Sequence, residues 1–217
     1  MIETVIWDWN GTLLDDLSVS FEATNRLLAA NGRAPLADLD CYRAVFSFPV
    51  IDYYRRIGFD FDQLPFDQLA QQYMDFYHPA AENCSLQSGA QQILEHLHRS
   101  GLRQVLLSAS KQSHLEMQLA RYPIAQYFDR VLGIQNIYAA SKQQLAIDFI
   151  AQSGQAATDF LFVGDSVHDF EVAQSCGARC VLFSGGHQAR SILEATGAPV
   201  IDALNELPAI CRALSDA

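Results

Sequence analysis

Short apolar runs of four to eight residues recur along most of this 217-residue chain. Their near-continuous hydrophobicity is typical of parallel strands that are buried on both faces of a sheet. The runs lie at 4–7, 104–108, 130–133, 159–164 and 179–186. Segments with helical periodicity separate the later ones, at 88–101, 111–122, 142–154 and 166–177. This alternation predicts an α/β fold, a doubly wound parallel sheet with right-handed crossovers.

Residues 16–83 depart from this alternation because the pattern there indicates helix only. The stretch interrupts the sheet directly after its first strand. We therefore predict two domains: a Rossmann-like core formed by residues 1–15 and 84–217, and a helical cap formed by residues 16–83.

Composition and charge exclude several classes of protein. Half of the residues are hydrophobic, which is enough for a sizeable core, and the net charge of -11 disfavours nucleic-acid binding. No apolar run approaches about 20 residues, so no membrane span is expected, and the N-terminus shows no signal peptide. Five scattered cysteines are typical of free thiols in a reducing compartment. We expect a cytoplasmic protein, with its oligomeric state left open.

Polar side chains occur where the predicted strands end. Asp8 follows the first strand, Ser108 ends the second, and Asp165 follows the fourth, with Asp169 four residues later; Lys142 begins the helix after the third. Ligands of open parallel sheets bind at the carboxyl ends of the strands. One such carboxylate could simply cap a helix, but five groups in this order predict a common site.

The chemistry of these groups indicates phosphate and a metal ion. Three carboxylates in one place repel each other unless a cation binds, and hard oxygen ligands suit Mg²⁺. Ser108 and Lys142 can donate to phosphate oxygens. A carboxylate beside the phosphorus can attack it and form an acyl phosphate, and Gly11 lets the chain turn closely past the phosphate.

Four segments resemble the motifs of the haloacid dehalogenase-like superfamily. They are WDWNGTLLDD at 7–16, VLLSASK at 105–111, Lys142, and FVGDSVHD at 162–169. The helical stretch directly after the first motif is similar to that of the phosphoglycolate-phosphatase-type branch.

The resemblance implies a role for each matching residue. Asp8 would be the nucleophile and a metal ligand, and the backbone carbonyl of Asn10 and the carboxylate of Asp165 would be further ligands. Asp169 would support Lys142 and the water molecules around the metal. The catalytic positions would be Asp8, Asn10 and Lys142. The residues expected to bind the phosphoryl group are Gly11, Thr12, Ser108, Ala109 and Lys142.

Position 10 departs from the family pattern. Phosphatases of this superfamily usually carry an aspartate there, which protonates the leaving oxygen and later activates water, whereas Asn10 cannot exchange a proton. General acid–base catalysis contributes about 10²–10⁴-fold. We therefore predict a Mg²⁺-dependent phosphatase that works through an aspartyl phosphate on Asp8 and is slowed by Asn10.

Other functions remain open on the same scaffold. One is a phospho-ligand binding protein, either without turnover or passing the phosphoryl group to an alcohol. Phosphonoacetaldehyde hydrolases share the Asp-Trp-x-Gly-Thr pattern but need a lysine from the cap, and the two lysines of this chain, Lys111 and Lys142, lie outside 16–83. Haloacid dehalogenases use the same nucleophile without a metal ion. The pair Asp165 and Asp169 indicates a cation and therefore argues against a dehalogenase.

The cap is expected to select the substrate, a small phosphorylated metabolite. Residues 46–58 are the best candidate segment: Arg55 would bind an anionic group and Tyr53 and Tyr54 would stack on the substrate. The alternative is that these aromatic residues pack inside the cap and the arginine is solvated.

A few further residues have open roles. His187, in the loop after the last predicted strand, is either a proton donor, a substrate contact or structural. Lys111 could touch the phosphate instead of, or beside, Lys142. Asp15 and Asp16 are expected to cap the first cap helix and form the hinge.

Overall fold

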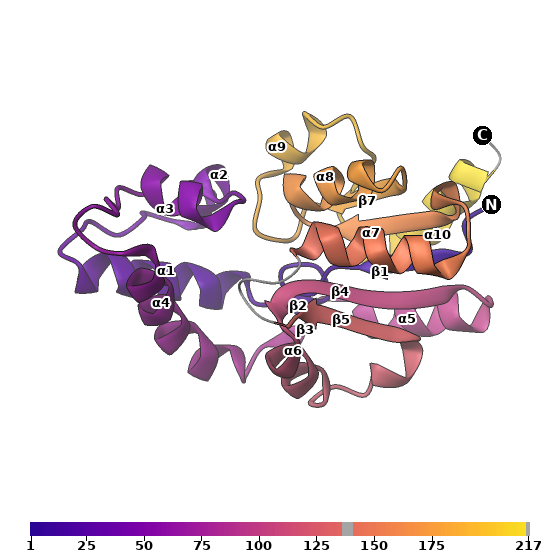
Figure 1. Ribbon diagram of the computed structural model, residues 1–217, viewed down its shortest axis with the longest axis horizontal. Helices are drawn as coiled ribbons and strands as arrows, with labels where there is room; N and C mark the ends of the chain where they lie inside the picture. Colours follow the sequence, from indigo (N-terminus) through magenta and orange to yellow (C-terminus); the bar gives the residue numbers. More distant parts are fainter. Residues whose placement is uncertain (136–140, 216–217) are drawn as a thin grey trace.

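A six-stranded parallel sheet forms the centre of the computed structural model, which describes residues 1–135 and 141–215 (Figure 1). The strand order is β5-β4-β1-β6-β7-β8, and each neighbouring pair is parallel. The strands are β1 (Thr4–Trp7), β4 (Arg103–Lys111), β5 (Arg130–Ile134), β6 (Phe160–Gly164), β7 (Arg179–Phe183) and β8 (Val200–Ile201). The predicted doubly wound α/β fold is confirmed.

Helices cover both faces of this sheet. Because strand side chains alternate, Val5 and Trp7 of β1 belong to one hydrophobic cluster and Ile6 to another. The first cluster includes residues of α5 (Ala90–Arg99) and α6 (Gln112–Leu119) together with Leu207 of α10 (Leu207–Ser215). The second includes residues of α7 (Lys142–Ser153), α8 (Val167–Ser175) and α9 (Arg190–Glu194). In the described parts of the chain, three single turns of 3-10 helix complete the core: η1 (Ala125–Tyr127), η2 (Ala157–Asp159) and η3 (Leu204–Glu206).

The strand order places the carboxyl end of β1 between those of β4 and β6. From β1 the chain builds β4 and β5 on one side, and then β6, β7 and β8 on the other. Such a reversal of direction is where ligands bind in open α/β sheets. The strand ends that carry Asp8, Ser108 and Asp165 are therefore neighbours.

Residues between β2 (Leu14–Asp15) and β3 (Ser85–Leu86) form helices, which lie beside the sheet in Figure 1. They are α1 (Leu17–Ala30), α2 (Leu39–Val45), α3 (Val50–Arg56) and α4 (Phe66–Ala81). β2 and β3 pair antiparallel at the two crossings. The helices share a hydrophobic cluster of their own, which includes Leu27, Tyr42 and Leu69. The division into domains at residues 15 and 84 stays a prediction that this separate cluster supports.

Some elements differ from the pattern in the sequence. The second strand was expected to end at Ser108, but β4 continues to Lys111, which pairs with Ile134 after a shift of register. Residues 46–49 separate α2 from α3, with Pro49 at the N-cap of α3, so residues 39–56 form two helices. Within the described residues no helix is long and apolar enough to cross a bilayer. Cys41, Cys84, Cys176 and Cys180 form no disulfide.

Candidate active site

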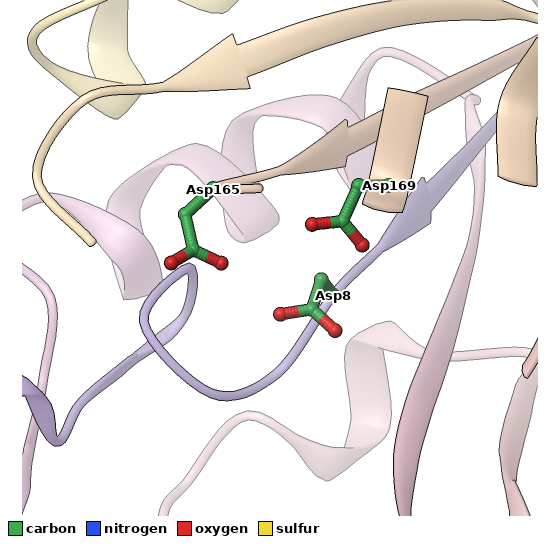
Figure 2. Close-up of side chains that lie close together, drawn as sticks. All are labelled: Asp8, Asp165 and Asp169. Carbon is green, nitrogen blue, oxygen red and sulfur yellow. The ribbon is translucent and has the colours of Figure 1, made fainter. Parts of the chain in front are cut away.

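Three carboxylates lie together at the carboxyl ends of the central strands. Asp8 follows β1, Asp165 follows β6, and Asp169 lies in the first turn of α8. One oxygen of each lies within 4.8 Å of the others, and Figure 2 shows the side chains pointing toward a common space. Asp165 and Asp169 are each 3% exposed. Carboxylates buried so deeply need cationic or hydrogen-bonding partners.

The turn after β1 is shaped around these acids. Gly11 has a φ of 76°, which favours glycine, and a Cβ at this position would collide with the carboxylate of Asp165. The Thr12 hydroxyl donates to Asp165 Oδ1 at 3.1 Å and lies 3.4 Å from Asp8 Oδ2. A Cβ at Gly164 would likewise collide with Asp169. The expected close turn at Gly11 is thus present, and Thr12 joins two of the acids.

Lys142 is the cation among the three acids. Its Nζ donates to Asp8 Oδ1 and, at 2.6 Å, to Asp169 Oδ1. The lysine begins α7, whose preceding residue Ser141 caps the helix by accepting from Gln144 N. Lys142 is 5% exposed, whereas Lys111 is exposed at the end of β4. Of the two lysines, the structure brings Lys142 to the acids.

Burial and mutual repulsion make the charged forms of Asp8 and Asp165 unfavourable when no cation is bound. Burial, with Asp169 and Asp165 adding to it against the opposing effect of Lys142, raises the pKa of Asp8 to about 8. Burial also raises the pKa of Asp165 to about 6. For Asp169 burial is outweighed by Lys142 and Ser166, which hold its pKa below the usual range. Such a donor set fits a hard divalent cation, since three acids exceed one lysine.

The tip of β4 borders the same space. Ser108 is buried, and its hydroxyl accepts from Ser110 N at 3.0 Å. Ala109 is exposed, and the Ser110 hydroxyl donates to Asn10 Oδ1 at 3.0 Å. Ser108 lies two residues beyond Leu106, the partner of Trp7 in the sheet. Ser108 and Ala109 therefore lie at the predicted sheet edge.

Asn10 is held by hydrogen bonds on both sides of its amide. Its Nδ2 donates to Asp16 Oδ2 at 2.9 Å and to the Tyr77 hydroxyl at 2.8 Å. Asp16 stands at the N-cap position of α1, but its side chain makes no capping bond. The expectation that its carboxylate caps this helix is wrong, because Asp16 instead accepts from Asn10, Gly11 and Tyr77.

His187 joins this group from the loop after β7. Its backbone N–H donates to Asp165 Oδ2 at 2.6 Å, and its ring contacts Asp16 Oδ1 through Nε2 at 3.2 Å and the Tyr42 hydroxyl through Nδ1 at 3.1 Å. Burial opposes the charged imidazole, but the Asp16 carboxylate outweighs it and raises the pKa of His187 to about 9. Asp16, although buried, has a lowered pKa because of His187, Tyr77 and Asn10.

These shifts predict that the metal-free protein loses stability as the pH rises from about 6.5 to 9. A free histidine has a pKa of about 6.5, so the folded state with its value of about 9 binds more protons across this range. The raised pKa of Asp8 acts in the same direction up to about pH 8. For His187 the loss is about 3 kcal/mol in the free energy of unfolding.

Urea unfolding in EDTA at a series of pH values measures this slope. His187→Gln removes the histidine contribution and is expected to reduce the slope from about pH 6.5 and to flatten the curve above about pH 8, where Asp8 no longer contributes. A wild-type curve that stays level from pH 6.5 to 9 would contradict the assigned pairing of His187 with Asp16.

Helix α2 and the turn after it contact the same loop. The Arg43 guanidinium donates to the carbonyls of Gly186 at 3.0 Å and Gly185 at 3.2 Å. Gln188 Nε2 donates to the Phe46 carbonyl at 2.9 Å. The helical segment is therefore fastened to the core beside the acids. Sequence patterns did not single out Gln188, which contacts the Phe46 carbonyl, or Tyr77 of α4, which contacts Asn10 and Asp16.

The expected specificity segment packs differently from the substrate-binding interpretation. Tyr53 and Tyr54 are each 2% exposed, and the Tyr53 hydroxyl donates to Thr24 at 3.1 Å. Arg55 pairs with Asp52 at 2.8 Å on the surface and lies over the ring of Phe61. In the described part of the chain Arg55 contacts none of the acids, so the packing alternative is favoured for these residues.

Comparison with known proteins assigns the family. The model for haloacid dehalogenase-like hydrolases matches residues 5–183. The chain belongs to the haloacid dehalogenase-like hydrolases, as its motifs indicated. It is 28% identical over 211 residues to phosphoglycolate phosphatase of Pseudomonas fluorescens strain Pf0-1, covering 94% of this chain and 77% of the relative. The enzyme of Pseudomonas putida strain KT2440, with the same name, is 28% identical over 212 residues with the same coverage.

Solved structures show the same fold. A haloacid dehalogenase-like hydrolase from Streptococcus pneumoniae superimposes with a TM-score of 0.82 at 18% identity, covering 96% of this chain and 98% of the other. A haloacid dehalogenase-like protein from Agrobacterium tumefaciens has a TM-score of 0.79 at 21% identity, covering 99% and 100%. The names of the sequence relatives agree with the expected class of enzyme, a phosphoric monoester hydrolase.

Proposed function

We propose that this chain is a Mg²⁺-dependent phosphatase that forms an aspartyl phosphate on Asp8. The observation that carries this proposal is the meeting of Asp8, Asp165 and Asp169 with Lys142 at the carboxyl ends of the strands, in a member of this family. The three carboxylates, with the carbonyl of Asn10, would hold the ion. Bound there, Mg²⁺ supplies positive charge that offsets the acids and the phosphate.

The residues of the chain then divide the work. An Asp8 oxygen attacks phosphorus, forming an acyl phosphate as the bond to the leaving alcohol oxygen breaks. Lys142 favours the ionised form of Asp8 and donates to the transferring group, with Ser108 as a second donor. Water later releases phosphate and restores Asp8. Gly11, Thr12 and Ala109 lie in the segments beside the transferring phosphoryl group.

Asn10 is expected to slow both proton transfers. Its amide donates to Asp16 and Tyr77, so it offers no acid for the leaving oxygen. That proton would come from water or the substrate itself, and the aspartyl phosphate would persist longer. Substrates whose leaving groups need little protonation are favoured, because the missing step contributes about 10²–10⁴-fold where it operates.

The substrate we propose is a small phosphorylated metabolite, selected by residues 16–83 acting as a cap. The helical segment contacts the core beside the acids through Arg43 and Phe46. The relatives named phosphoglycolate phosphatase put 2-phosphoglycolate first in a panel of candidates.

Metal dependence tests the proposal directly. We expect turnover of an aryl phosphate to stop in EDTA and to return with added Mg²⁺, because three carboxylates share one space. Release of the phenol, followed by absorbance, is the measurement. A protein that binds phosphate equally well with and without Mg²⁺ but releases no phenol would instead be a phospho-ligand binding protein.

A further inference from the structure

Asp16 is a buried carboxylate whose hydrogen bonds converge from separate segments. It is 1% exposed. Besides the Asn10 amide, it accepts from Gly11 N at 2.8 Å and from the Tyr77 hydroxyl at 2.5 Å, and it contacts His187 Nε2 at 3.2 Å. A carboxylate at this depth is stable only when its oxygens are well supplied with donors.

These partners come from the parts that build the site. Asn10 and Gly11 belong to the turn that follows Asp8, and Tyr77 lies on α4. His187 lies in the loop after β7, and its backbone N–H donates to Asp165. One side chain thus fixes the turn beside the nucleophile and joins it to the helical segment.

Asn10 is the complement of this carboxylate. Its amide nitrogen donates to Asp16 and Tyr77, while its oxygen accepts from Ser110. An aspartate at position 10 would lose the donor and bring a second negative charge against Asp16. Like charges in a buried place repel strongly.

We propose that Asp16 is a positioning residue and that Asn10 and Asp16 form a matched amide–carboxylate pair, which sets the turn beside Asp8 and fastens α4 to it. Its effect on turnover rests on the proposed phosphatase function. Asn10 is then required by Asp16, so restoring an acid at position 10 needs a second change at position 16.

An exchange of the two groups tests the pair. Asn10→Asp places two carboxylates together and Asp16→Asn places two amides together. The double variant Asn10→Asp/Asp16→Asn again has one of each. Since hydrogen bonds to charged groups are strong, we expect each single change to lower kcat on an aryl phosphate about tenfold or more, with a smaller change in KM. The double variant is expected to return to the wild-type rate or to exceed it.

Several outcomes would overturn the pairing. One is a double variant as slow as the product of the two single losses, since independent sites combine in that way. Another is Asn10→Asp alone exceeding the wild type. Asp15→Asn is the matched control, because it makes the same change at the exposed neighbour of Asp16 and is expected to leave kcat unchanged.

Thermal unfolding in EDTA keeps the test separate from the proposed function. If the wild type shows no Mg²⁺-dependent turnover, the phosphatase assignment fails, while recovery of Tm in the double variant still supports the pair. If Asp16→Asn does not fold, Tyr77→Phe replaces it, because this change removes one donor from Asp16 and one acceptor from Asn10. A folded Tyr77→Phe with wild-type kcat would contradict the proposal.

Discussion

Asp8→Asn is expected to abolish turnover of an aryl phosphate, with a loss of more than about 10³-fold in kcat, the order seen when a nucleophile is removed. The carboxylate of Asp8 is the group we propose to attack phosphorus, and an amide at the same place is a far weaker nucleophile. Intact mass after quenching with acid provides a second measurement: the wild type should carry one added phosphoryl group and the variant none.

Stability separates this loss from misfolding. Burial and the neighbouring acids raise the pKa of Asp8 to about 8, so its charge is unfavourable in the metal-free protein. A neutral amide is therefore expected to leave Tm in EDTA unchanged or higher. Asp159→Asn makes the same exchange just before β6, at the amino-terminal ends of the strands and far from the acids. It is the matched control and should turn over substrate normally. Appreciable turnover by Asp8→Asn would contradict the assignment of the nucleophile.

The sequence predicted that the acids lie together, because two of them, Asp8 and Asp165, directly follow buried strands and Asp169 lies four residues after Asp165. Asp8 and Asp165 come directly after apolar runs whose burial is evident from composition, and parallel strands bring their carboxyl ends to one edge. Lys142 begins a helix with a clear apolar pattern. For these residues the local sequence pattern determines the strand or helix, and the position of that strand or helix in the fold determines where the side chain lies.

The partners of Asp16 could not be predicted in this way. Tyr77 lies 61 residues from Asp16 and His187 lies 171 residues away. Their meeting depends on how α4 and the loop after β7 approach the turn, which no local pattern encodes. One signal was available: an amide at position 10 needs a strong acceptor in a buried site, and an acid stands six positions later.

The tip of β4 shows a second limit of local patterns. Polar residues after Leu107 suggested that the strand ends at Ser108, yet pairing resumes at Lys111 with Ile134. Pairing with the neighbouring strand β5 extends β4 beyond its hydrophobic run. Tertiary context here overrides the β propensity of the local sequence. The same reason explains Tyr53 and Tyr54, whose burial follows from the packing of α3 on its neighbours.

Removal of Lys142 is expected to have the second large effect. Its Nζ lies between Asp8 and Asp169 and is their cationic partner. Burial is outweighed by these two acids, so the pKa of the lysine stays above its ordinary value and it is charged throughout the neutral range. Lys142→Met leaves the acids buried without their cationic partner. Removing one partner of a buried ion pair typically lowers the free energy of unfolding by about 3–5 kcal/mol.

Urea unfolding of Lys142→Met in EDTA at pH 8 should show this loss in the free energy of unfolding, and kcat with Mg²⁺ should fall about 10²–10³-fold, as for a lost transition-state donor. The stability deficit should narrow toward pH 5, because the pKa values of Asp8 and Asp169 rise without the lysine and protons replace its charge. Added Mg²⁺ should likewise stabilise the variant more than the wild type, since the ion then supplies the missing positive charge. Lys111→Met, at the exposed end of β4, is the matched control with wild-type behaviour expected; equal losses in both variants would show that Lys142 has no special place among the acids.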